Sequence, residues 1–139
     1  MRALSETLTV RTRGRGLVDF TAAVAAWLRR VQAGTGVATL FIQHTSASLL
    51  VQENADPDVQ ADLERFFAKL VPDGDPSFVH TAEGPDDMPS HVRAALTQTS
   101  VAVPVVGGEL ALGRWQGLYV YEHRLAGQAR RVVASYLGN

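Results

Sequence analysis

The stretch from residue 101 to the C-terminus most limits what this chain can fold into, because its patterns are those of strands. Short runs rich in valine, leucine or tyrosine end at glycines or polar turns, which is typical of β-structure. Gly107 and Gly108 predict a hairpin between the first two runs, and we expect the last two to pair across 126–128. The four runs are VAVPVV at 101–106, ELAL at 109–112, GLYVYEH at 117–123 and ARRVVASYL at 129–137.

The first hundred residues mix strand and helix patterns. A period of two predicts a strand over 4–12, and apolar residues predict a buried strand over 37–43, followed by an extended segment at 48–53. The chain of 139 residues fits one domain, 1–139. This order predicts an α+β fold with a mixed, largely antiparallel sheet and helices on one face. Helices are predicted over 19–32, 56–70 and 88–98, with Asp19 and Asp56 as caps of the first two and Pro57 at the first helical position of the second.

Composition excludes several classes of protein. Thirteen basic and fourteen acidic residues give a net charge of −1, which argues against binding to nucleic acid or to a membrane surface. No run approaches the ~20 apolar residues that span a bilayer, and the first residues lack the apolar core of a signal peptide. We therefore expect a cytoplasmic protein. Because there is no cysteine, a metal site must use histidine, carboxylate or water.

Three of the four histidines lie at positions that often carry functional side chains. His44 is at a strand end, His80 is in a long loop, and His91 is in the first turn of a helix. Three neutral imidazoles can bind one divalent ion and leave a position open for water or substrate. Their spacing matches no compact zinc motif, so three unrelated surface histidines are the alternative. The identity of the metal, zinc or magnesium, stays open.

Carboxylates and hydroxyls accompany these histidines. Glu83 and Asp87 lie between the second and third histidine and suit acid–base work or oxygen ligation. The alternative for Asp87 is to cap the next helix. Thr45, Ser46 and Ser48 offer hydroxyls and small side chains that suit phosphate oxygens, and ordinary packing in a strand is their alternative.

A polar turn opens the run at 117–123. Its Trp115 suits a stacking wall for a flat heteroaromatic ring, with Gln116 reading the ring edge; a core tryptophan is the alternative. Further along, an inward-facing Glu122 would need Arg124 or another cation as its partner. We interpret that pair as structural.

Four strings, in order and over nearly the whole chain, resemble the YjbQ-like family, small bacterial and archaeal proteins described as secondary thiamine-phosphate synthases. The strings are QHTSASLLVQENADPDVQADLERFF, EGPDDMPSHVRAAL, LALGRWQGLYVYEHR and ARRVVASY. The resemblance implies an α+β fold whose sheet curls into a half-barrel with helices packed on it, a homotrimer, and a metal near the histidines. The chain departs from the family's usual Gly-Thr-Trp-Gln-Gly at Arg114, whose side chain would bind an anion or face solvent.

The activity implied by the resemblance joins hydroxymethylpyrimidine pyrophosphate to thiazole phosphate and releases pyrophosphate. Two alternatives stay open: a metal-dependent hydrolase or lyase acting on a phosphorylated small molecule, and a non-catalytic trimer that binds a metabolite. In the first hypothesis, His44, His80 and His91 bind a divalent metal, and Glu83 or Asp87 completes or orients its shell. Phosphate is bound by Thr45, Ser46 and Ser48. The pyrimidine ring is held by Trp115 and Gln116.

Overall fold

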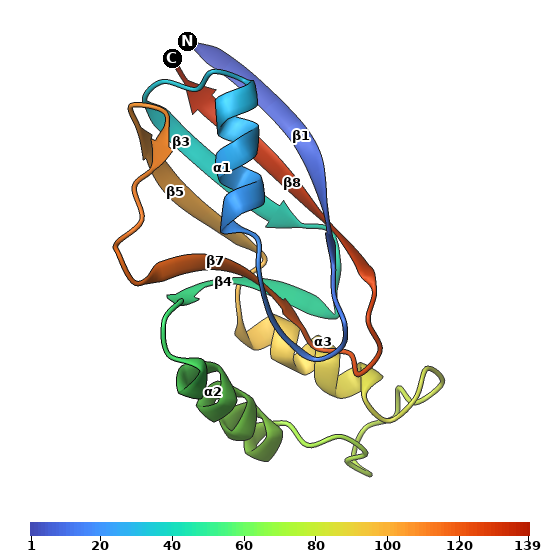
Figure 1. Ribbon diagram of the computed structural model, residues 1–139. Helices are drawn as coiled ribbons and strands as arrows, with labels where there is room; N and C mark the ends of the chain where they lie inside the picture. Colours follow the sequence, from blue (N-terminus) through green and yellow to red (C-terminus); the bar gives the residue numbers. More distant parts are fainter.

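Antiparallel strands curl into a half-barrel with three helices in the computed structural model, which describes residues 1–139 (Figure 1). A five-stranded sheet has the order β1-β8-β3-β5-β6, and a three-stranded sheet has the order β2-β7-β4. The α+β prediction is confirmed, but every strand pair is antiparallel, so the sheets are not mixed. The elements are β1 (Arg2–Arg11), β2 (Gly16–Asp19), α1 (Thr21–Arg30), β3 (Gly36–Ile42), β4 (Ala47–Glu53), α2 (Pro57–Leu70), α3 (Asp87–Leu96), β5 (Ser100–Val106), β6 (Glu109–Leu110), β7 (Gln116–Glu122) and β8 (Ala129–Gly138).

One predicted hairpin forms and the other does not. β5 and β6 pair across Gly107 and Gly108, whose φ angles of 57° and 85° suit glycine. The predicted pairing of β7 with β8 is wrong, because these strands belong to different sheets. β8 pairs with β1 over ten residues and with β3 on its other edge, while β7 lies between β2 and β4. The link 123–128 therefore crosses from one sheet to the other.

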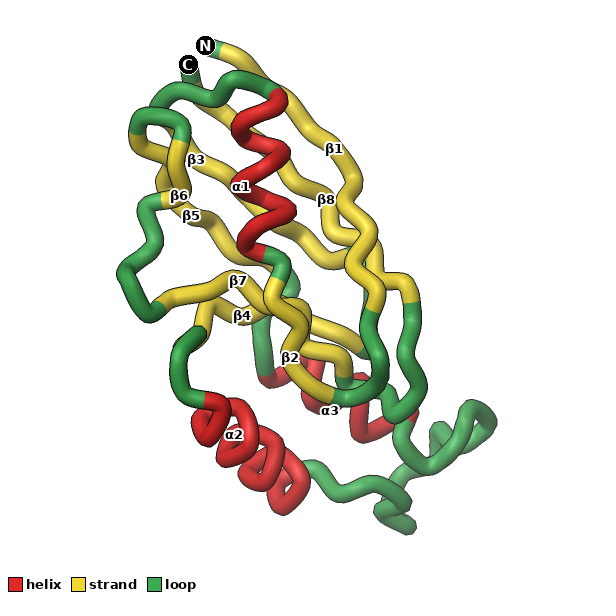
Figure 2. Tube along the Cα trace, in the orientation of Figure 1, coloured by secondary structure: helices red, strands yellow, loops and turns green.

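The core lies inside the half-barrel, where α1 packs against the five-stranded sheet (Figure 2). Val24, Trp27 and Leu28 of α1 are buried there. In β3 the inward Leu40 is buried, whereas the outward Phe41 is 49% exposed. This alternation is the period of two expected for a sheet with one covered face.

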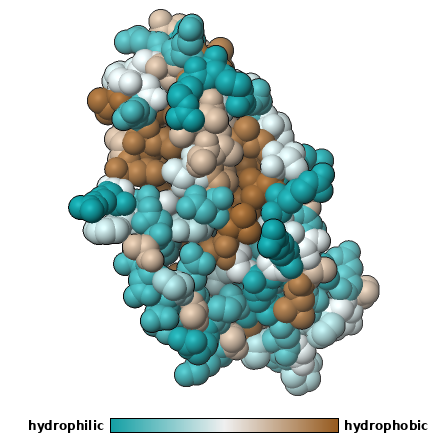
Figure 3. Space-filling view, in the orientation of Figure 1, coloured by the Kyte–Doolittle hydropathy of each residue, from teal (hydrophilic) through white to brown (hydrophobic).

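The second and third helices lie beside the three-stranded sheet, away from α1 (Figure 1). The predicted start of α2 is confirmed, since Asp56 accepts a hydrogen bond from the Asp58 amide at 2.9 Å and Pro57 is the first helical residue. None of the three helices has the length and apolar character needed to cross a membrane. Apolar side chains gather around α1, whereas the surface over α2 and the following loop is mainly polar (Figure 3).

Candidate metal centre

Three side chains converge at the start of α3: His80, Asp87 and His91, whose ligand atoms all lie within 4.8 Å of one another. Nε2 of His80 is 2.7 Å from Oδ2 of Asp87, and Nε2 of His91 is 3.2 Å from the same oxygen. Asp87 opens α3 and His91 follows four residues later, so both lie on one face of the helix. His80 reaches them from the preceding loop. We refer to these three residues as the triad.

A hydrogen bond outside the triad fixes the ring of His91. Its Nδ1 lies 2.8 Å from the carbonyl oxygen of Thr45. Because a carbonyl only accepts, Nδ1 carries a proton. Nε2 of His91 then faces Oδ2 of Asp87 either as a donor, in the protonated ring, or as a lone pair, in the neutral ring, where a cation between the two atoms would bind both. The triad therefore fits a divalent ion, and the contact with Thr45 is of the kind that orients metal-binding histidines.

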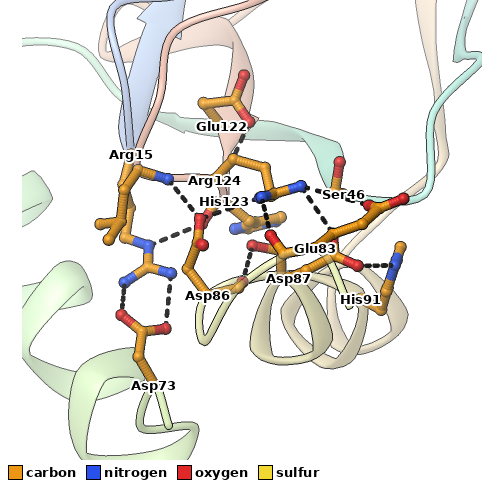
Figure 4. A network of polar contacts seen from close by, with 12 residues as sticks. Arg15, Ser46, Asp73, Glu83, Asp86, Asp87, His91, Glu122, His123 and Arg124 are labelled. Atoms are coloured by element: carbon orange, nitrogen blue, oxygen red, sulfur yellow. Dashed lines mark hydrogen bonds and ion pairs between the residues drawn. The ribbon is translucent and has the colours of Figure 1, made fainter. Parts of the chain in front are cut away.

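The carboxylate of Asp87 is ionised although its side chain is only 2% exposed. Burial opposes its charge, but the hydrogen bond with His80 and the nearby charges of His91 and Arg124 hold the pKa of Asp87 below its usual value. Nη1 of Arg124 donates to Oδ1 of Asp87 at 2.8 Å, and Nε donates to Asp86 at 3.0 Å (Figure 4). Oδ2 of Asp87 is thereby left facing the two histidines.

His44, predicted as a metal ligand, lies outside the triad, and the third member of the triad is Asp87. The backbone amide of Arg131 donates to Nε2 of His44 at 2.8 Å, which occupies this nitrogen. His44 instead lines a cavity of about 430 Å³ together with Thr45 and His91. The structure thus places two of the three predicted histidine ligands in the triad and one in a neighbouring wall.

The three predicted phosphate-binding hydroxyls have different surroundings. Thr45 is exposed, and Oγ of Ser46 accepts a hydrogen bond from Nη2 of Arg130 at 2.9 Å. Ser48 is only 1% exposed, and its Oγ contacts Nε2 of His123 at 2.9 Å. Oγ1 of Thr97 also donates to the Ser48 hydroxyl at 2.6 Å. Because His123 and Thr97 both engage this hydroxyl, the structure gives no support to a phosphate-binding role for Ser48.

Glu83 lies at the rim of the triad. Its side chain is 66% exposed, with Oε2 3.7 Å from Nη1 of Arg124. Its carbonyl oxygen accepts a hydrogen bond from Nη2 of the same arginine at 2.9 Å. Glu83 can therefore approach a ligand from solvent, but it does not contact the two histidines.

The turn at 114–116 lies at the other end of the three-stranded sheet. In the pairing of β4 with β7, Gln116 is opposite Glu53 while Glu122 is opposite Ala47. Six residue steps of a strand span about 20 Å, so Trp115 and Gln116 lie away from the triad within one chain. Trp115 is 55% exposed, and the guanidinium carbon of Arg114 lies 4.8 Å from its ring centroid.

The sequence does not mark Arg124 and Arg130 as site residues. It suggests Arg124 as a partner for Glu122, whereas in the structure Arg124 donates to Asp87 of the triad. The partner of Glu122 is Arg130, whose Nε donates to Oε1 at 2.8 Å. The sequence signal for such a partner is Glu122 itself, because a carboxylate in a buried strand requires a cation nearby. Arg124 and Arg130 both lie close in sequence, and the sequence does not show which of them pairs with Glu122.

Comparison with known proteins supplies the family. The model of the UPF0047 protein YjbQ-like family matches residues 6–139. The chain belongs to the YjbQ-like family. A UPF0047 protein of Synechocystis is 46% identical over 137 residues, covering 99% of this chain and 93% of the relative. The UPF0047 protein YjbQ of Escherichia coli O157:H7 is 41% identical and covers 96% of each chain.

Solved structures of related proteins share the fold of this YjbQ-like chain. A conserved hypothetical protein from Thermus thermophilus has a TM-score of 0.86 at 35% identity, covering 95% of this chain and 99% of the other. A hypothetical protein from Aeropyrum pernix has a TM-score of 0.88 at 31% identity, covering 98% and 99%. These similarities establish the family and the fold.

Proposed function

We propose that this YjbQ-like protein is a divalent-metal enzyme that acts on a phosphorylated small molecule of the cytoplasm. The observation that carries the proposal is the hydrogen bond from Nδ1 of His91 to Thr45, which leaves Nε2 directed at Oδ2 of Asp87. Two imidazoles and a carboxylate favour zinc or a similar transition metal over magnesium, which prefers oxygen ligands. Three protein ligands also leave a position open for substrate, as in catalytic zinc sites.

The reaction we propose is the one suggested by the resemblance to thiamine-phosphate synthases, the joining of hydroxymethylpyrimidine pyrophosphate to thiazole phosphate. A divalent ion held by the triad would neutralise charge on the leaving pyrophosphate. Arg124 holds Asp87 ionised and oriented, and Glu83 lies exposed at the rim. The cavity beside His91, about 430 Å³, has the size of a small-molecule site.

Metal content tests the ligand assignment. The protein is stripped with EDTA, reloaded with zinc, dialysed and assayed for bound metal. We expect about one ion per chain in the wild type, because each chain has one triad, and background levels in His91→Ala and Asp87→Asn. Arg65→Ala, an exposed site on α2, is the matched control. Full occupancy in His91→Ala with an unchanged circular dichroism spectrum would refute the assignment.

A second assay separates the reactions. The loaded and the stripped protein are each incubated with the two thiamine precursors and with a panel of phosphorylated metabolites. Metal-dependent formation of thiamine phosphate and pyrophosphate supports the transferase. Metal-dependent release of inorganic phosphate supports a hydrolase using the same triad. Thermal stabilisation by a metabolite without turnover indicates a binding protein and contradicts an enzyme.

We further propose that the chain forms a homotrimer through the outer face of the five-stranded sheet. No helix covers this face (Figure 2). By the register of β3 with β8, the side chains on this face include Phe41, Val133 and Leu137. Phe41 and Leu137 are 49% and 47% exposed, and apolar sheet faces of this kind suit subunit contacts. Light scattering coupled to size exclusion tests the assembly, with Phe41→Glu expected to lower the mass. A monomeric wild type would contradict the proposal.

A further inference from the structure

A second polar centre lies beside the triad, around the buried side chain of Arg130, which is 2% exposed. Its Nε and Nη2 donate to the two carboxylate oxygens of Glu122 at 2.8 and 2.5 Å. Nη2 also donates to Oγ of Ser46 at 2.9 Å. The bidentate pair neutralises the charge of the guanidinium. The remaining nitrogen of the guanidinium, Nη1, lies 3.3 Å from Nδ1 of His44.

The protonation of His44 follows from its other nitrogen. Nε2 accepts the backbone N–H of Arg131 at 2.8 Å, so the lone pair of the neutral ring is there and Nδ1 carries the proton. Burial, together with the charges of Arg130 and Arg131, lowers the pKa of His44, which favours this neutral ring. Nδ1 of His44 and Nη1 of Arg130 are therefore two donors that face each other.

A third donor stands next to them. Oγ of Ser46 accepts from Arg130 and donates its own proton to no protein atom. Three donors, Nδ1 of His44, Nη1 of Arg130 and Oγ of Ser46, thus have no acceptor. One water molecule accepts at most two hydrogen bonds, whereas the oxygens of a phosphate or carboxylate group accept several. The donor set matches an oxyanion better than it matches a water.

We propose that His44, Ser46 and Arg130 form a binding site for an oxyanion group of the substrate. The inference rests on the proposed function, in which the triad holds the metal ion that acts on the substrate. Thr45, between His44 and Ser46 in the chain, accepts the hydrogen bond from His91, so one three-residue segment ties the anion site to the triad. His44, Thr45 and His91 also line the same cavity. A phosphorylated ligand in that cavity would contact one residue of each centre, His44 of the anion site and His91 of the triad.

The site is held in place before any ligand binds. Thr12 donates to Oε1 of Glu122 at 2.6 Å, and the backbone amide of Arg124 donates to Oε2 at 3.1 Å. Glu122 is fully buried and positions Arg130 from a strand of the opposite sheet. Such fixed donors bind an anion without reorganisation. The buried ion pair thus has a use beyond joining the two sheets.

The test uses protein stripped of metal with EDTA, so that anion binding is measured without the triad's ion. Inorganic phosphate, pyrophosphate and acetate are titrated by calorimetry at pH 7.5 and low chloride. We expect millimolar or tighter binding of at least one of them, weakened about tenfold by Ser46→Ala, because a hydrogen bond to a charged group is lost. Ser46→Thr, which keeps the hydroxyl, should bind like the wild type. Preference for the phosphates over acetate assigns a phosphoryl ligand, and the reverse assigns a carboxylate.

Failure of this inference is distinguishable from failure of the metal assignment. His91→Ala should lose zinc yet keep anion binding in EDTA, whereas Ser46→Ala should keep zinc. His44→Gln, which removes the Nδ1 donor, provides a second variant if Ser46→Ala fails to fold. Two results would overturn the anion site. One is equal affinity of the wild type and Ser46→Ala for every anion. The other is that the stripped wild type binds none of the anions at a concentration of about 10 mM, ten times a millimolar Kd.

Discussion

Nη1 of Arg124 donates to Oδ1 of Asp87 at 2.8 Å, on the carboxylate oxygen that does not face the histidines. The two oxygens of Asp87 are thus divided, one for the arginine and one for His80 and His91. This relationship links β7 to the start of α3, because Arg124 follows that strand by two residues. It also makes Arg124 a positioning residue for the triad.

Replacing Arg124 should weaken metal binding without removing a ligand. In Arg124→Met the Asp87 carboxylate loses its orienting partner, and we expect zinc affinity to fall by about 10- to 100-fold, the usual effect of losing such a partner. A competition titration against a chromophoric chelator measures the change. Arg65→Met on the exposed face of α2 removes an arginine of similar length and should leave affinity unchanged. Unchanged affinity in Arg124→Met would mean that Asp87 needs no support.

Because of His123, the free energy of unfolding should fall as the pH drops below the pKa of a histidine in the unfolded chain. This ring is fully buried, and burial, with the charges of Arg93, Arg15 and Arg130, lowers its pKa to about 3. Between pH 6.5 and about 3 the unfolded chain therefore binds a proton that the folded chain does not, so the free energy of unfolding decreases with decreasing pH.

The expected loss from His123 between pH 7 and pH 5 is about 2 kcal/mol. Urea denaturation at the two pH values measures it. His123→Gln keeps a side chain that can bond to Ser48 but cannot titrate, so its free energy of unfolding should change about 2 kcal/mol less over the same interval. The same pH dependence in both proteins would show that His123 is protonated in the folded state.

Local sequence signals predicted local structure well. The Gly107–Gly108 hairpin and the Asp56–Pro57 helix start depend on neighbouring residues alone, and both form. His80, Asp87 and His91 lie within twelve residues and meet through one loop and one helical turn. A reader of the sequence can therefore identify most of the triad.

Features set by distant pairing were beyond the sequence. β8 follows β7 closely, yet it pairs with β1 and β3, because its ten residues match strands on both edges. The position of His44 depends on the amide of Arg131, 87 residues away, which donates to its Nε2, and His44 lies outside the triad. Nothing in the sequence shows that Arg124 binds Asp87 and Arg130 binds Glu122, because these pairs depend on the fold.

Trp115 should be independent of the metal within a single chain. Because it lies about 20 Å along the strand direction from the end of β7 that carries the site, Trp115→Phe should change zinc affinity by less than about twofold, the scatter expected for a distant site. The chelator competition used for Arg124 gives the value. A large loss in Trp115→Phe would place this side chain at the triad of another subunit.

The buried pair of Glu122 and Arg130 should be costly to break from one side. Glu122→Gln leaves the guanidinium of Arg130 without its counter-charge in a fully buried position, and we expect the free energy of unfolding to fall by about 3–5 kcal/mol. Glu6→Gln breaks the exposed pair with Arg30, whose side chains are 46% and 57% exposed, and should cost less than about 1 kcal/mol. Chemical denaturation of both variants at pH 7.5 measures the difference. Equal losses would show that Arg130 finds another acceptor, such as water entering between the sheets, and that its position does not depend on Glu122.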